Sequence, residues 1–314
     1  MHPMKPLTSY GPAELSHGPI FIGLLFNTIL YGVMIIQSYF YFTTFRNDKT
    51  WTKIFVASIL VLDTLNTVFD FLYLYESLII HFDDVPFLSR ATWLFATDPV
   101  TTAIIASLVQ LFYAWRVKVL TGNIWLTLFV VACSVAGLAG GIATTVEVMV
   151  MPRFMDFIRF KSAVIVWLVA ECVGDLVITI ILVKHLSSQR TGLEDTDILI
   201  DRIIRLTMQT GLVTAICAIV DLILFLSDPV GLHLLFNIPL CKLYSNSLLS
   251  SLNARHLHAT AGSADSGTTV LVMSKRSSVP PPPQFRSSVF IDVESITTRV
   301  SDVSGAPIQE AAVV

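Results

Sequence analysis

Seven long apolar runs constrain the fold of this chain more than any other feature. Each holds about 20 or more mostly apolar residues, the length that a helix needs to cross the hydrocarbon core of a bilayer. Backbone polar groups in hydrocarbon must be bonded within their own segment, so the runs predict helices. They are too long for the strands of a membrane barrel and do not alternate. The predicted spans are about 19–42, 53–80, 92–116, 124–150, 162–184, 204–227 and 229–250.

The composition agrees with a protein that faces lipid. Hydrophobic residues make up 54% of the 314 residues and charged residues only 14%, with a mean hydropathy of +0.72. Soluble domains carry about 25% charged residues. The net charge of -3 argues against a nucleic-acid partner, so the expected partner is the lipid bilayer. All four cysteines lie in apolar runs and are interpreted as small hydrophobic residues, with no disulfide, metal or cofactor expected.

Three regions follow from these patterns. Residues 1–17 form a short extracellular leader without the basic segment of a cleaved signal peptide. Residues 18–255 form a transmembrane domain, so the predicted fold class is all-α, an integral membrane bundle of seven helices. From residue 256 to 314, Ser, Thr and Pro dominate, and this composition predicts a disordered cytosolic tail.

Loop charge predicts the orientation, because Lys and Arg are enriched in short cytosolic loops. Ten basic residues follow the first, third, fifth and seventh predicted helices, against five in the leader and the opposite gaps. Arg153, Arg159 and Lys161 oppose this trend. The tally predicts an N-terminus outside and a C-terminus in the cytosol, in a plasma membrane or an endomembrane.

Local signals suggest several helix ends and contacts. Asp98-Pro99 and Asp228-Pro229 each place a capping acid before a proline suited to the first helical position. The third predicted helix therefore begins near Pro99, or else Pro99 kinks it. Thr191 and Glu194 have the spacing of a capping box. They predict a cytosolic extension of the sixth helix, either simply solvated or, with the 187–205 loop and the tail, a docking surface for a cytosolic partner.

Glycines at 137, 140 and 141 of the fourth predicted helix allow another helix to approach closely. We interpret this pattern as packing inside the bundle, with a dimer interface as the alternative.

Polar residues inside the predicted spans are the candidate site, because ionisable groups at membrane depth are expensive. Asp63, Asn66 and Asp70 share one helical face, and Glu171 and Asp175 are four residues apart on another helix. The remaining candidates are Gln110, Asp221 and Lys242. We expect the second, fifth, sixth and seventh helices to surround a polar cavity for a small ligand or ion. Interhelical hydrogen bonding and a proton relay remain as alternative interpretations.

Lys242 is interpreted as the counter-ion of a nearby carboxylate or as a lysine that reaches the cytosolic interface. A Schiff base to retinal is an alternative without other support in the chain. Glu171 and Asp175 could serve as acid and base of an intramembrane hydrolase, but no supporting catalytic motif is present, so no enzyme is expected.

Three segments resemble one family. They are KLYSNSLLSSLNAR (Lys242 to Arg255), VQLFYAWRV (Val109 to Val117) and the first-helix run LFNTILYGVMIIQSYFYF. Most of residues 18–255 is similar to an uncharacterised family of seven-helix membrane proteins from mushroom-forming fungi that carry domain of unknown function 6534. The resemblance implies a multi-pass protein with an outer N-terminus and no established ligand or activity. The residues that carry the motif are Trp115, Arg116, Lys242, Tyr244, Asn246, Ser247, Asn253 and Arg255.

Helix count, orientation and the tail favour a receptor-like or sensory protein, although the chain departs from G-protein-coupled receptors. Ala114-Trp115-Arg116 stands where those receptors have an acid-Arg-Tyr triplet, and Asn237, Pro239 and Tyr244 do not match the Asn-Pro-x-x-Tyr spacing. The alternatives are a small-solute or proton-coupled transporter, for which no internal repeat is found, and a structural membrane protein without a ligand.

Overall fold

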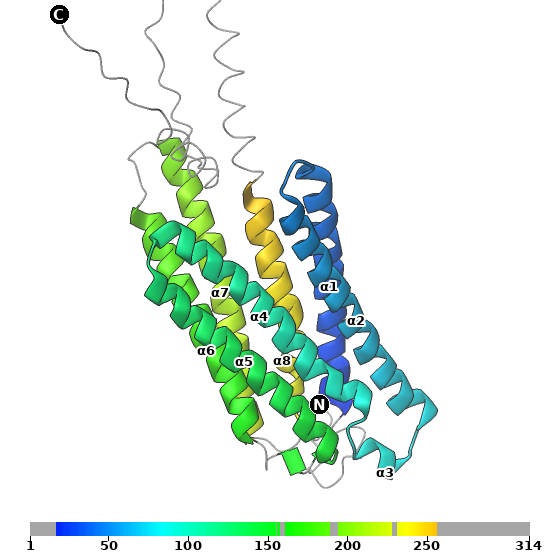
Figure 1. The fold of residues 1–314 in the computed structure, drawn as a ribbon. Coiled ribbons are helices and arrows are strands. Elements are labelled where there is room, and N and C mark those ends of the chain that lie inside the picture. The colour runs from blue at the N-terminus through cyan, green and yellow to red at the C-terminus, as the bar shows by residue number, and fades with distance from the viewer. Residues whose placement is uncertain (1–16, 155, 158–160, 189–193, 228–230, 256–314) are drawn as a thin grey trace, which may run out of the picture. The chain divides into compact units, whose positions relative to one another are not determined.

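The computed structural model of this protein is a set of long helices that run side by side (Figure 1). It describes residues 17–154, 156–157, 161–188, 194–227 and 231–255, which belong to a unit formed by residues 1–261; a second unit, 262–314, lies outside the described residues. The helices are α1 (Gly18–Thr44), α2 (Thr50–Tyr75), the π-helical turn η3 (Glu76–Ile80), α3 (Val85–Leu88), α4 (Trp93–Thr121), α5 (Ile124–Val150), α6 (Lys161–Ser188), α7 (Glu194–Ser227) and α8 (Leu234–Asn237). Residues 240–255 are also helical and are called the closing helix below.

Length and hydropathy make several of these helices fit to cross a membrane. Among the described residues, five qualify: α1, the continuous α2–η3 segment, α4, α5 and α6. The apolar stretch of α7, Gly211–Ser227, is shorter. The protein is therefore a multi-pass helical membrane protein, while the count of seven spans stays a prediction.

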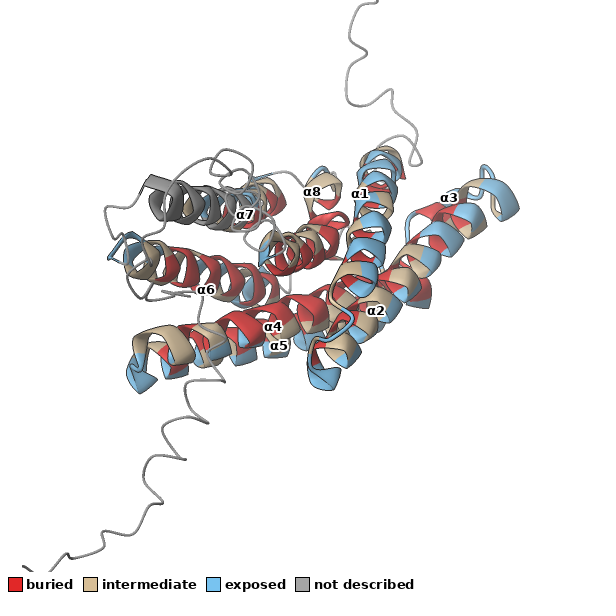
Figure 2. Cartoon of the chain, turned by 90° about the horizontal axis from the view of Figure 1, so that it is seen from above, coloured by how far each residue is buried: buried red, intermediate tan, exposed pale blue. Residues whose placement is uncertain are grey.

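The outer surface of the described residues is apolar, unlike that of a soluble protein, and several ionisable side chains lie inside beside an apolar core. Large apolar residues cover the outer surface; Ile36 on α1 is 69% exposed and Phe71 on α2 is 60% exposed. Asp63, Asn66 and Lys242, by contrast, are fully buried. Figure 2 shows the buried residues of α4 and α6 on their inner sides and the exposed residues of α1 and α2 on the outside. Apolar groups outside and ionisable groups inside suit a bundle whose solvent is hydrocarbon.

The seventh apolar run is not one continuous helix. The prediction of a single helix over about 229–250 is wrong, because α8 ends at Asn237 and the closing helix begins at residue 240. Pro239 explains the break, since its ring removes a backbone N–H and obstructs the preceding turn. Its carbonyl accepts from the backbone N–H groups of Lys242 and Leu243 at 3.1 and 3.2 Å, which starts the closing helix.

The predicted role of Asp98 as a helix cap is also wrong. α4 begins at Trp93 with Thr92 at its N-cap, so Asp98 and Pro99 both lie inside the helix. Only 4% of the Asp98 residue is exposed. An Asp-Pro pair looks the same in sequence at the start of a helix and inside one. Here α4 packs against α2 and continues through the pair.

The glycines of α5 serve packing inside the bundle, as interpreted from the sequence. A Cβ atom on Gly140 would lie 2.7 Å from the backbone nitrogen of Trp167 on α6, and one on Gly137 would lie 3.1 Å from the Cγ atom of Glu171. A Cβ atom on Gly141 would collide with Ala103 on α4. Small residues thus bring α5 against both α4 and α6.

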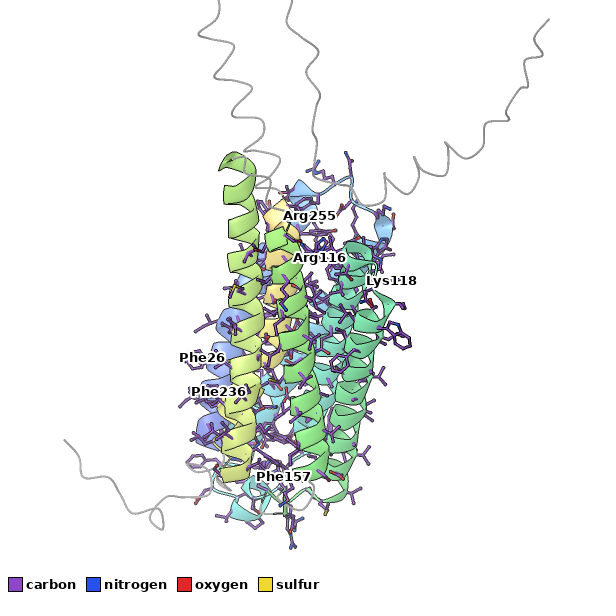
Figure 3. All side chains as sticks on the ribbon, turned by 90° about the vertical axis from the view of Figure 1, so that its left-hand side faces the viewer. Phe26, Arg116, Lys118, Phe157, Phe236 and Arg255 are labelled. Carbon is purple, nitrogen blue, oxygen red and sulfur yellow. The ribbon has the colours of Figure 1, made fainter. Side chains whose placement is uncertain are left out.

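One end of the bundle, called the basic end below, carries three basic residues that Figure 3 labels. Arg116, Lys118 and Arg255 lie at one end, and Phe157 lies at the other (Figure 3). Near Phe157, an isolated antiparallel bridge between Arg90 and Arg153 joins the segment before α4 to the one after α5. At the basic end, Gly122 (φ +66°) ends α4 and the Asn123 side chain caps α5.

Several predicted features lie outside the described residues. These are the 1–16 part of the leader, the cap at Asp228-Pro229, Thr191 of the capping box and the tail from residue 256.

Candidate functional site

Lys242 is the centre of a buried polar group that joins the closing helix to α2. Its ammonium lies 3.0 Å from Oδ1 of Asp63 in an ion pair, and both side chains are fully buried. It also donates to the backbone carbonyl of Asp63 at 2.9 Å and to Oδ1 of Asn66 at 2.8 Å. A lysine ammonium has three protons and here it has three oxygen partners. The counter-ion role predicted for Lys242 is therefore confirmed.

Asn66 extends this group to α1 and α4. Its amide nitrogen donates to Oδ1 of Asp98 at 3.0 Å and to the hydroxyl of Thr101 at 3.1 Å. Asn27 on α1 donates to Oδ2 of Asp70 at 2.8 Å and lies 3.5 Å from Oδ1 of Asn66. We call Asn27, Asp63, Asn66, Asp70, Asp98 and Lys242 the lysine network. Through it, one ammonium group influences the positions of α1, α2, α4 and the closing helix.

A second polar group, the acid group, lies among α4, α6 and the closing helix. The Gln110 amide donates to Oδ1 of Asp175 at 2.9 Å and to the carbonyl of Glu171 at 3.0 Å. Trp167 donates its indole N–H to Oε1 of Glu171 at 2.6 Å. The Tyr244 hydroxyl interacts electrostatically with both carboxyl groups. Gly174 permits this arrangement, since a Cβ atom there would lie 2.9 Å from the Gln110 amide nitrogen.

The carboxyl group of Asp221 on α7 interacts electrostatically with both polar groups. It accepts a hydrogen bond of 2.8 Å from Asn237 of α8 and is fully buried. Its carboxyl interacts with that of Asp98 and with that of Glu171. Buried carboxyl groups therefore extend from α2 through α4 and α7 to α6. Lys242 is the one buried Lys or Arg among the described residues.

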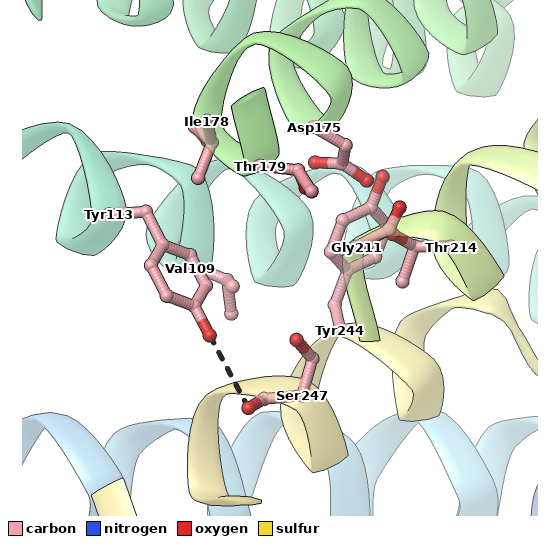
Figure 4. Close-up of a pocket in the computed structure, with 9 residues that line it drawn as sticks. All are labelled: Val109, Tyr113, Asp175, Ile178, Thr179, Gly211, Thr214, Tyr244 and Ser247. Carbon is pink, nitrogen blue, oxygen red and sulfur yellow. Dashed lines mark hydrogen bonds between the residues drawn. The ribbon is translucent and has the colours of Figure 1, made fainter. Parts of the chain in front are cut away.

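A cavity of about 20 Å³ opens beside the acid group (Figure 4). This volume holds roughly one water molecule. Figure 4 shows oxygen atoms of Asp175, Thr214 and Tyr244 close together, and the hydrogen bond from Tyr113 to the Ser247 carbonyl, 3.3 Å long, on another side. The lining residues are Val109, Tyr113, Asp175, Ile178, Thr179, Gly211, Thr214, Tyr244 and Ser247.

Several residues of the resemblance motif connect the closing helix to α1 and to α4. Asn246 donates to the Leu30 carbonyl at 3.0 Å, and Asn253 donates to that of Gln37 at 2.9 Å, so both attach the closing helix to α1. Arg116 donates to the Ser251 hydroxyl at 2.7 Å, and Trp115 packs on Trp51 with ring centroids 5.3 Å apart.

Arg255, the last motif residue, forms an ion pair of 2.6 Å with Asp48 in the turn between α1 and α2. Tyr41 donates to the same carboxylate at 2.9 Å. Burial raises the pKa of the Asp48 carboxyl, but the hydrogen bonds and charge of Arg255 and the bond from Tyr41 outweigh burial and hold it below its ordinary value. This contact therefore fixes the end of the closing helix against the α1–α2 turn.

The eight predicted site residues are all buried, but they divide between these groups. Asp63, Asn66, Asp70 and Lys242 belong to the lysine network, and Gln110, Glu171 and Asp175 to the acid group, with Asp221 between them. Of the eight, Asp175 lines the described cavity.

Sequence reasoning missed Asn27, Asp98 and the hydroxyl residues around the cavity. Asn27 could have been identified as an interior polar residue because its amide stands alone in an apolar run. The i, i+4 spacing of Asp98 and Thr102, whose hydroxyl lies 3.5 Å from Oδ1 of Asp98, was the clue to an interior acid.

Comparison with known proteins finds a family model that matches the C-terminal part of this site. No curated protein and no solved structure matches the chain. The matched segment begins at Glu171 and ends just beyond Arg255, so it contains Asp175, Asp221 and Lys242. Over residues 171–257 the chain matches the model of a family of unknown function, DUF6534.

Proposed function

We propose that this protein is a receptor-like or sensory membrane protein whose helices are held in one arrangement by the lysine network. The observation that carries the proposal is the Lys242 ammonium, bonded to Asp63 and Asn66 with no exposed surface. Breaking these contacts within the membrane is expensive, so the network acts as a latch between the closing helix and α2.

A latch of this kind gives the helices two arrangements, one in which the Lys242 contacts are formed and one in which they are broken. The lysine network holds three carboxyl groups and one ammonium, so it is sensitive to any stimulus that adds, removes or displaces a charge. Sensory proteins use such bistable contacts, because a stimulus that favours one arrangement shifts the populations.

The proposed orientation places the N-terminus outside and the basic end of the bundle in the cytosol. Arg116, Lys118 and Arg255 gather at that end, which supports the orientation through the enrichment of basic residues on the cytosolic side (Figure 3). A cytosolic partner would then meet the 187–205 loop and the tail. Attachment of glycosylation sequons to each terminus, read by the mass of the glycosylated protein, tests this topology.

A proton-coupled transporter is the second candidate. The break between α8 and the closing helix supports it, since transporters place ion and substrate groups at discontinuous helices. Asn237, the last residue of α8, holds the buried Asp221 beside this break.

Distance measurements between spin labels test the sensor. Labels at Ile36→Cys on α1 and Val169→Cys on α6, both at exposed positions, would report helix arrangement in a protein whose half-buried Cys133 and Cys217 are replaced by alanine. We expect two distance populations in lipid nanodiscs, with the minor one increased by Lys242→Met. One unchanged distance in both proteins would contradict the sensor and favour a structural role.

Proton flux into liposomes tests the second candidate. A transporter predicts solute-driven flux that Lys242→Met or Asp221→Asn abolishes, whereas the sensor predicts a distance change without flux. Lys118→Met, an exposed lysine in α4, is the matched control in both assays.

A further inference from the structure

Arg116, near the basic end of the bundle, has no acidic partner among the described residues. Its Nη1 donates to the Ser251 hydroxyl at 2.7 Å, which is its one hydrogen bond to the described part of the chain. The titratable groups that act on it are Tyr113 and the guanidinium of Arg255, which repels it. Arg255 itself is neutralised by Asp48 at 2.6 Å. Within the described residues, the positive charge of Arg116 is therefore left without a counter-charge.

The unused edge of the Arg116 guanidinium matches the geometry of a phosphate group. A guanidinium has five N–H donors in a planar fork, and the bond to Ser251 uses one of them, on Nη1. The donors on Nε and Nη2 can bind two oxygens of one phosphate group in parallel. The Arg116 residue is partly exposed, so a ligand from outside the bundle can reach this edge.

The surroundings of Arg116 indicate that a lipid headgroup is the source of this phosphate. The preceding residue, Trp115, packs edge to face on Trp51 of α2, with ring centroids 5.3 Å apart, and both rings are exposed. Exposed tryptophans of membrane proteins gather at the level of the lipid headgroups, so Arg116 lies at this depth. Ile54, on the same face of α2 as Trp51, is exposed, and so is Leu111 on the Trp115 face of α4. The tryptophan pair thus continues into an apolar surface that suits acyl chains.

The beginning of α2 and the turn before it add positive charge to this region. Residues 45–53 contain Arg46, Lys49 and Lys53 against one acid, Asp48. The ion pair between Asp48 and Arg255 holds this segment against the end of the closing helix. Basic pockets between helices at a membrane surface attract anionic lipid headgroups.

We propose that Arg116, with Ser251 and Arg255 beside it, binds the phosphate group of an anionic phospholipid in the leaflet at the basic end. The lipid would connect α4 to the closing helix at a point where no described acid does so. The proposal does not depend on the orientation of the bundle or on whether the protein is a sensor or a transporter.

Quenching of tryptophan fluorescence by lipids with brominated acyl chains tests the proposal, because Trp51 and Trp115 lie beside the site. The full chain would be reconstituted in phosphatidylcholine liposomes that contain increasing fractions of brominated phosphatidic acid or, for reference, brominated phosphatidylcholine. We expect the protein to bind phosphatidic acid about ten times more strongly than phosphatidylcholine, as one charge-assisted contact provides. Arg116→Gln should remove most of this preference.

Lys118→Gln is the matched control, because it removes the same charge from an exposed position two residues away and should keep the preference. Equal binding of the two lipids by the wild type, or a preference that survives in Arg116→Gln, would overturn the proposal. An equal loss in Lys118→Gln would show general attraction to the basic end and would also overturn it.

Two further arms make the test specific. Inorganic phosphate at millimolar concentration and constant ionic strength should leave the preference for phosphatidic acid unchanged; its loss would assign the site to a soluble anion and overturn the lipid. Should Arg116→Gln fail to fold, Arg116→Lys decides, because lysine keeps the charge and lacks the parallel pair of donors. A weaker preference in Arg116→Lys supports the site, and an unchanged one refutes it.

Discussion

Replacement of Lys242 by methionine removes the ammonium of the lysine network and keeps most of the side-chain volume. It leaves Asp63 without its counter-ion and removes three oxygen contacts, of 3.0, 2.9 and 2.8 Å. Removing one partner of a buried ion pair costs about 3–5 kcal/mol. Hydrogen bonds between membrane helices contribute only about 0.6 kcal/mol each, so the unpaired carboxylate dominates the expected loss.

The assay is reversible unfolding in mixed micelles of non-ionic detergent and dodecyl sulfate, followed by circular dichroism. We expect Lys242→Met to lower the free energy of unfolding by about 3–5 kcal/mol. The double variant Lys242→Met/Asp63→Leu should recover part of this loss, because the carboxylate that pairs with the ammonium is then absent, while Asp70 and Asp98 still lack the charge of Lys242. The same substitution at the exposed Lys118 should change stability by less than about 0.5 kcal/mol. Equal effects at Lys242 and Lys118, or a double variant that shows the sum of the single losses, would refute the reasoning.

Three further predictions use the same unfolding assay. Gly140→Ala should destabilise by about 1–3 kcal/mol, because its Cβ would lie 2.7 Å from the Trp167 backbone nitrogen, whereas Gly32→Ala, with open space around it, should be neutral or stabilising; equal effects would contradict the packing of α5 on α6. Burial lowers the pKa of His17 to about 4, so stability should fall as the pH drops from about 6.5 towards 4, where the unfolded chain alone takes up the proton; His17→Phe should remove that fall, and an unchanged pH profile would refute it. The lowered pKa of Asp48 predicts stability that is present above about pH 4 and lost on further acidification; Asp48→Asn should cost less than about 1 kcal/mol at pH 7 because the pair is partly exposed, and a loss that persists unchanged at pH 2 would contradict the ion pair.

The helices could be predicted from the sequence because length and hydropathy are local properties. The predicted run 124–150 coincides with α5, and 19–42 differs from α1 by one residue at its start and two at its end. Breaks inside a run are harder to predict. Pro99 lies inside α4, whereas Pro239 separates α8 from the closing helix, and only the surrounding packing distinguishes the two.

The candidate site was predictable as a set of residue types and not as an arrangement. An ionisable residue in a spanning helix stands out in a sequence, which is why Asp63 and Lys242 were both identified. Their pairing was not predictable, since 179 positions separate them. Hydroxyl residues of the cavity, such as Thr179 and Ser247, have no distinctive signal, because Ser and Thr in helices commonly bond to their own backbone.

Collision rates of a spin label at Ile36→Cys test most directly whether hydrocarbon surrounds this bundle. Ile36 is 69% exposed on α1, and Lys118 at the basic end is also exposed. In liposomes, the account predicts that the Ile36 label collides often with oxygen, which partitions into hydrocarbon, and rarely with a polar nickel chelate, while a label at Lys118→Cys shows the reverse. Frequent collisions of the Ile36 label with the nickel chelate would contradict the account.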